Sequence, residues 1–209
     1  MSDHVLRLSR DRLEPAARTA LPAVDRVLYV LEGELTVDGR ALAVDSAWHG
    51  AGACATVAGP TGATVLRYEL VKKDARTPGR PLLAHDIALD ANGAYLMRCD
   101  RVEFELGAEA RPHRHRGGGI RYLVHGTLEL RIEGERDRLI KAGEAWFESG
   151  REPVYARASP TTPTSFIRCS ILPLELRGKS SIMYVDPADA DGKPRKYTVL
   201  VDEPIAVPR

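Results

Sequence analysis

The stretch Asp25-Arg-Val-Leu-Tyr-Val-Leu-Glu-Gly-Glu-Leu-Thr-Val-Asp-Gly39 recurs later in the chain as Gly118-Gly-Ile-Arg-Tyr-Leu-Val-His-Gly-Thr-Leu-Glu-Leu-Arg-Ile-Glu-Gly134. Gly33 aligns with Gly126, 93 residues further on, and the tyrosine four residues before each glycine is shared. Downstream, the segment around Arg67 aligns with a segment 101 residues further on. Small loop insertions explain why the offset between the two copies increases from 93 to 101 residues. A repeat of this kind predicts a duplicated structural unit.

The repeated unit has the pattern of β-strands. Leu128, Leu130 and Ile132 alternate with polar residues, as in a strand with one buried face. Other segments are short, rich in Val, Leu, Ile and Tyr, and interrupted by Gly or Pro. They span residues 26–37, 63–71, 95–106 and 165–172. The sequence therefore predicts an all-β fold, with a sandwich or barrel in each repeat.

The repeat and the composition together divide the chain into four parts. We expect an N-terminal domain over residues 1–73, a linker with the first strand of the second unit over 74–94, a C-terminal domain over 95–172 and an extension over 173–209 that packs on the barrels. The extension contains Lys196-Tyr-Thr-Val-Leu-Val201, which is typical of a strand that adds to a sheet edge.

Charge and composition exclude several classes of protein. The chain has 30 Lys and Arg against 29 Asp and Glu, a formal charge of +1, so we expect no nucleic-acid partner. No apolar run approaches the ~20 residues of a membrane span, and the first residues lack the apolar core of a signal peptide. The three cysteines have no C-x-x-C spacing and predict reduced thiols in a cytoplasmic protein.

The segment 107–126 carries the chemistry. His113 and His115 are two residues apart in an expected strand, so their side chains project from one face. Two imidazoles on one face can present nitrogen to a divalent transition metal such as Fe, Mn, Ni or Zn. The arginines around the pair favour an anionic small-molecule ligand, and the planar guanidinium of Arg121 suits a carboxylate.

This segment resembles the first signature of the cupin superfamily: glycine, the H-x-H pair, a glutamate and a second glycine at fixed spacing. Gly107, His113, His115 and Gly126 stand at matching positions, and residues 141–155 are similar to the second signature. The resemblance implies small jelly-roll β-barrels. With the duplication, it implies two tandem cupin domains (a bicupin protein) with a C-terminal extension, and a homodimer.

The departures from the signatures limit what the resemblance implies about metal binding. In cupin enzymes both histidines, the glutamate and a second-signature histidine hold the metal, but here the last two positions fall on Gly119 and about Val154. The N-terminal repeat has no H-x-H. His125 is a candidate third ligand on the parity of its strand, or else a histidine bonded to backbone or water at the end of the barrel. Tyr155 and Arg121 are candidate substrate-binding residues.

Three functions stay open at this point. The first is a metal-dependent, dioxygenase-like enzyme that acts on a small organic acid or aromatic compound, with catalytic residues unassigned. The second is a non-catalytic protein that binds a small molecule, and the third is a structural protein whose pocket has lost metal ligation.

Overall fold

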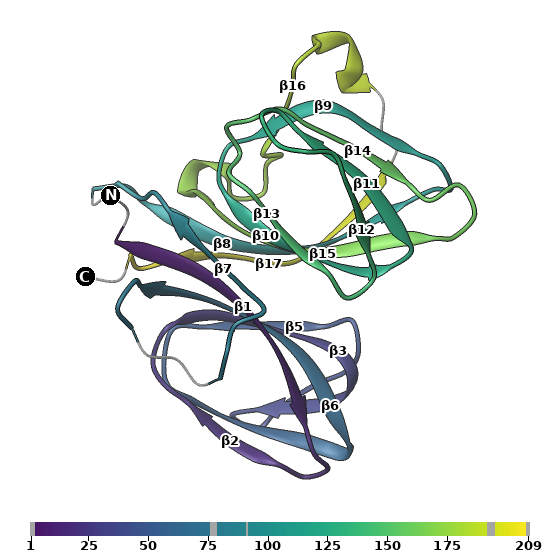
Figure 1. Ribbon diagram of the computed structural model, residues 1–209. Coiled ribbons are helices and arrows are strands. Elements are labelled where there is room, and N and C mark those ends of the chain that lie inside the picture. The colour runs from purple at the N-terminus through teal and green to yellow at the C-terminus, as the bar shows by residue number, and fades with distance from the viewer. Residues whose placement is uncertain (1–2, 76–78, 91, 192–194, 208–209) are drawn as a thin grey trace. The chain divides into compact units, whose positions relative to one another are not determined.

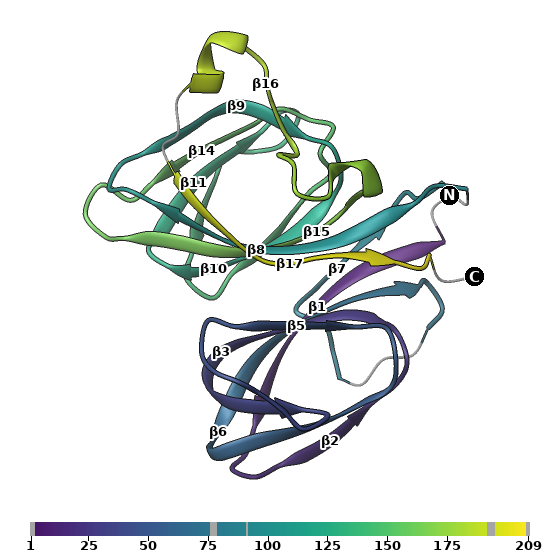
Figure 2. The same cartoon turned by 180° about the vertical axis from the view of Figure 1, so that it is seen from behind.

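The computed structural model describes residues 3–75, 79–90, 92–191 and 195–207. It contains two compact units, one made of Met1–Tyr95 with Glu203–Arg209 and the other of Leu96–Asp202. Each unit is a ring of strands (Figures 1 and 2), and the only helical elements among the described residues are two 3-10 turns. The expected all-β fold is confirmed.

The first unit is built on seven strands. They are β1 (His4–Leu13), β2 (Arg18–Leu21), β3 (Asp25–Val37), β4 (Arg40–Leu42), β5 (Ala47–Gly50), β6 (Cys54–Lys72) and β7 (Leu83–Ile87). The sheet order is β4-β3-β6-β1-β7, while β2 pairs with β6 and β5 pairs with β3. The long strands β3 and β6 pair with each other from one end of β3 to the other.

Glycine explains how these long strands bend. The pairing of β3 with β6 shifts in register between Gly33 and Leu35, and Gly33 has a φ of +73°. A Cβ atom at Gly33 would lie 2.1 Å from the carbonyl oxygen of Gly62. Gly126, which aligns with Gly33, has a φ of +77°, and a Cβ atom there would lie 2.5 Å from the hydroxyl of Thr164. The repeated glycine thus marks a corner that no other residue fits.

The second unit repeats the strand pairing of the first. Its strands are β8 (Tyr95–Phe104), β9 (Glu109–His115), β10 (Gly119–His125), β11 (Thr127–Ile132), β12 (Arg138–Lys141), β13 (Ala145–Glu148), β14 (Val154–Ala158) and β15 (Thr164–Pro173). With β16 (Ile182–Tyr184) and β17 (Arg195–Ile205) from later in the chain, one sheet has the order β13-β10-β15-β8-β17 and the other β12-β11-β14-β9-β16. The order β13-β10-β15-β8 matches β5-β3-β6-β1 of the first unit.

The core of the second unit lies between its two sheets. Leu128, Leu130 and Ile132 are buried there, as their alternation predicts. Trp146 is also buried and contacts Phe166 edge to face, with ring centroids 5.3 Å apart. This apolar layer fills part of the barrel and leaves the rest to polar side chains.

The C-terminal extension adds one edge strand to each sheet of the second unit. It contains η1 (Leu174–Leu176), β16 (Ile182–Tyr184), η2 (Pro187–Asp191) and β17 (Arg195–Ile205). In the sheets, β16 pairs with β9 and β17 pairs with β8. The expected strand at residues 196–201 is therefore confirmed. Buried Arg98 fixes this segment by donating to the carbonyls of Leu176 and Lys179 and to the carboxylate of Asp202.

The segment 74–94 differs from the sequence-based expectation in one respect. It holds β7, which pairs with β1 of the first unit along the register from His4–Ile87 to Leu8–Leu83. The strand expected there as the first of the second unit thus extends the sheet of the first unit. In the described part of the chain, no helix has the length and apolar character needed to cross a membrane.

Candidate functional site

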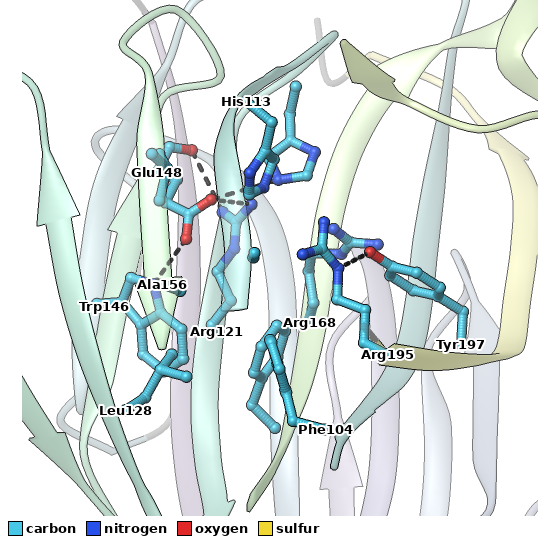
Figure 3. Close-up of a pocket in the computed structure, with 14 residues that line it drawn as sticks. Phe104, His113, Arg121, Leu128, Trp146, Glu148, Ala156, Arg168, Arg195 and Tyr197 are labelled. Atoms are coloured by element: carbon cyan, nitrogen blue, oxygen red, sulfur yellow. Dashed lines mark hydrogen bonds and ion pairs between the residues drawn. The ribbon is translucent and has the colours of Figure 1, made fainter. Parts of the chain in front are cut away.

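His113 points from β9 into a cavity of the second unit (Figure 3), and His115 of the same strand lines this cavity too. Their side chains are 5% and 6% exposed, and their ring centroids are 4.9 Å apart. Nδ1 of His113 lies 2.7 Å from the carbonyl of Arg111 and is therefore the protonated nitrogen, which leaves the lone pair on Nε2. Both side chains project from the same face of β9, as their spacing in the sequence predicts.

Both imidazoles are neutral near pH 7. Burial, followed by the charge of Arg195, lowers the pKa of His113 to about 4. Burial, followed by the charges of Arg168 and Arg121, places the pKa of His115 well below its usual value. Nδ1 of His115 is buried and has no hydrogen-bond partner among the described residues.

Glu148 is a site residue that the sequence analysis missed. It lies at the end of β13, where it is the register partner of Gly119 on β10. Its carboxylate accepts a hydrogen bond from Nε1 of Trp146 at 2.8 Å, and Nε2 of His115 lies 3.5 Å from its Oε2. Glu148 is two residues after Trp146 in a strand, so the same parity rule that places the tryptophan in the core would have found it.

Arg121 is 1% exposed and lies against this carboxylate. Its Nη2 is 2.7 Å from Oε2 of Glu148, and its Nη1 donates to the carbonyl of Gly119 at 2.6 Å. The sequence predicts that Arg121 holds the carboxylate of a ligand. In the structure it is paired with a carboxylate of the chain itself, which sits one strand away from the position where the cupin signature has its glutamate.

Two further arginines face Arg121 across the cavity (Figure 3). Arg168 forms a bidentate ion pair with Asp100, at 2.9 and 2.5 Å. Arg195, at the start of β17, donates to the hydroxyl of Tyr197 and lies over the ring of Phe104, 5.8 Å from its centroid. Nη1 of Arg195 is buried, and among the described residues it has no hydrogen-bond partner.

The charges around the cavity are therefore unequal. Three guanidinium groups face it, while Glu148 and Asp100 are the described carboxylates that pair with them and both histidines are neutral. The free volume of this inner chamber is about 20 Å³. One water needs roughly 10–15 Å³, so the chamber admits one or two water-sized groups. A buried excess of positive charge favours a small anion at this place.

The first unit provides an internal comparison for the chamber. Arg26 and Glu69 are cross-strand partners there and form a fully buried ion pair at 3.1 Å. The aligned cross-strand partners in the second unit are Gly119 and Ser170. The Arg67–Asp11 ion pair of the first unit has its equivalent in Arg168–Asp100, so the arginine of β6 and β15 is common to both units. At these aligned positions the first unit therefore has a buried ion pair and the second has two small residues.

A second, larger cavity adjoins the chamber. Its volume is about 330 Å³, and Arg168 and Tyr197 line both cavities. This outer cavity is bounded by the segment Gly178–Ile182 and by Val199 of β17. Its size falls at the lower end of the range for small-molecule pockets.

Two other candidates from the sequence lie outside both cavities. His125 is exposed at the end of β10, where the pairing with β15 shifts in register between Leu123 and His125 and the strand parity is broken. The expectation that His125 faces the interior is therefore wrong. Tyr155 follows Val154 on β14 and points to the other face, where Arg131 lies over its ring at 5.2 Å from the centroid. Val154 itself lines the chamber.

The side chains in the chamber do not fit a transition metal as they are arranged. No three His, Cys, Asp or Glu side chains within the described ranges are grouped to hold an ion. His113, His115 and Glu148 come nearest, but Arg121 occupies the oxygen of Glu148 that faces His115. A dication would also lie beside three guanidinium groups, which is unfavourable.

Comparisons with known proteins place the fold. No protein-family model matches the sequence, and no curated protein matches it. Among solved structures, a mutant of Bacillus subtilis oxalate decarboxylase is 13% identical with a TM-score of 0.64, covering 86% of this chain and 71% of that one. Lactobacillus farciminis oxalate decarboxylase in its formate complex is 12% identical with a TM-score of 0.65, covering 91% and 82%.

A third match is salicylate 1,2-dioxygenase from Pseudaminobacter salicylatoxidans, 13% identical with a TM-score of 0.57, covering 81% of this chain and 71% of that one. These neighbours are cupin-fold proteins, and this chain has the cupin fold.

Proposed function

We propose that the second unit binds an organic acid, with the carboxylate of the ligand in the inner chamber. The observation that carries this proposal is Arg195, whose buried Nη1 has no hydrogen-bond partner in the described part of the chain and which lines the same chamber as two neutral imidazoles. A carboxylate there would accept from Arg195 in a charge-assisted hydrogen bond and offset the excess positive charge. Nδ1 of His115 offers a further hydrogen-bonding group.

The sizes of the two cavities indicate what kind of acid fits. The inner chamber has room for a carboxylate group and little more, because its volume is about 20 Å³. The rest of the ligand would lie in the outer cavity of about 330 Å³, past Arg168 and Tyr197. The structural neighbours named above act on or bind oxalate, salicylate and formate, which are all carboxylates.

A metal-dependent, dioxygenase-like enzyme is the second candidate. The 3.5 Å between Nε2 of His115 and Oε2 of Glu148 is close to the ~3.4 Å that separates two ligand atoms of one tetrahedral metal. Such an enzyme would require Arg121 to release Glu148. The two-domain cupin organisation, the homodimer and the cytoplasmic location remain predictions from the sequence.

Thermal unfolding with small acids tests the proposal. We expect formate, which fits the inner chamber alone, and benzoate, whose ring needs the outer cavity, to raise the melting temperature. A ligand at 100 times its Kd stabilises the folded state by about 2.7 kcal/mol. Sodium chloride at equal ionic strength is the control for screening.

The variant Arg195→Met should lose the response to both acids. Arg136→Met removes the same charge from an exposed turn and should keep it. If neither acid stabilises the native protein more than chloride does, the proposal is wrong.

A further inference from the structure

The chamber brings together three groups that suit a divalent metal. His113 presents the lone pair of Nε2, because its Nδ1 is bonded to the carbonyl of Arg111. Two imidazoles and one carboxylate are a common ligand set for divalent transition metals. Glu148 supplies the carboxylate from β13, in the register position opposite Gly119. Within the described ranges these three side chains are not grouped to hold an ion as they stand, and a fourth residue is bound to the carboxylate.

That residue is Arg121, which forms an ion pair with the carboxylate that a metal ion would need. Its Nη2 lies 2.7 Å from the oxygen of Glu148 that also faces His115, and its side chain is almost fully buried. The guanidinium is further fixed by its hydrogen bond to the carbonyl of Gly119. Arginine stays charged at all accessible pH values, so this cation does not leave by deprotonation.

We infer that Arg121 is a built-in cation that takes the place of a metal ion and keeps divalent metals out of the chamber. His113, His115 and Glu148 form a latent metal site, and Arg121 and a metal compete for the same carboxylate. This inference uses the chamber of the proposed function but not its ligand, so each can fail without the other.

Metal uptake in variants of the full chain tests the inference. Wild-type protein dialysed against Zn²⁺ or Co²⁺ should retain far less than one equivalent by elemental analysis. Arg121→Met removes the charge and keeps an unbranched side chain. We expect it to bind about one equivalent, with an affinity about 100-fold or more above wild type, because a unit charge at this distance is removed from a buried site. The Co²⁺ form should show the absorption bands of a cobalt ion bound to nitrogen and oxygen.

Two further variants control the result. Arg121→Lys keeps the cation and should still exclude metal, while the double variant Arg121→Met with His113→Ala should lose the metal that the single variant gains. If Arg121→Met does not fold by circular dichroism, Arg121→Gln takes its place. Stoichiometric metal in the wild type that His113→Ala removes would overturn the inference, as would a folded Arg121→Met protein that binds none.

Discussion

His113 is a buried imidazole whose protonation the fold opposes. Its pKa of about 4 in the folded state lies below the ordinary value of 6.5, with burial as the main cause. Between these two values the unfolded chain binds a proton that the folded chain does not. The contribution of neutral His113 to stability is therefore complete above pH 6.5 and is lost as the pH falls toward 4. The loss is on the order of 3 kcal/mol.

Urea unfolding at several pH values between 7 and 4 checks this prediction. The variant His113→Gln cannot take up the proton, so its free energy of unfolding should fall less steeply over this range than that of the wild type. His85→Gln, on an exposed position of β7, is the control and should follow the wild type. Equal pH profiles for wild type and His113→Gln would contradict the account.

Single residues also show which parts of the site the sequence could predict and which it could not. The H-x-H spacing places His113 and His115 on one inward face, because strand parity is a local rule. The same rule gives the wrong face for His125, because the strand register shifts between Leu123 and His125. No residue type in this segment signals such a shift. Gly119 stands where the cupin signature has a glutamate, which suggests that the site lacks this carboxylate. The structure instead places the carboxylate of Glu148 on the neighbouring strand of the sheet, opposite Gly119.

At the scale of the element, β17 supplies Arg195 to the chamber and is anchored through Asp202. The carboxylate of Asp202 accepts two hydrogen bonds from Arg98, at 2.8 and 2.9 Å, and one from the backbone amide of Gly178 at 2.7 Å. Arg98 is buried, so loss of its partner leaves a poorly compensated charge inside the protein. This ion pair holds both the strand and the segment that bounds the outer cavity.

The variant Asp202→Asn should therefore lower the free energy of unfolding by roughly 2–4 kcal/mol. We also expect it to weaken acid binding, because β17 carries Arg195 and lines the outer cavity. Chemical denaturation and the thermal response to benzoate measure the two effects. Asp137→Asn, whose ion pair with Arg131 is exposed, should change stability by less than about 1 kcal/mol. A similar small change for Asp202→Asn would show that the anchor is not needed.

The expected strand of the extension illustrates why elements are easier to predict than their contacts. Residues 196–201 have a local strand pattern, and the structure confirms the strand. The pairing of Arg98 with Asp202 joins residues 104 positions apart in the chain. No local pattern encodes such a contact, so the role of the extension in forming the site could not be predicted.

At the scale of the whole molecule, the duplication explains both the fold and the asymmetry of the site. The repeated glycines and tyrosines predict two units of like topology, and the strand order repeats between them. The same alignment, applied to interior positions, sets Arg26 and Glu69 against Gly119 and Ser170. The first unit has a buried ion pair at these positions, and the second has small residues there and three guanidinium groups around its chamber.

We propose above that the second unit binds an acid with the carboxylate of the ligand in the inner chamber. Isothermal titration of the native protein with benzoate tests it most directly, together with the variant Ser170→Glu. This variant adds a carboxylate to the second unit at the position aligned with Glu69, which pairs with Arg67 in the first unit. The account predicts one benzoate per chain in the wild type and none in Ser170→Glu. No binding to the wild type, two molecules per chain, or undiminished binding to a folded Ser170→Glu protein would contradict it.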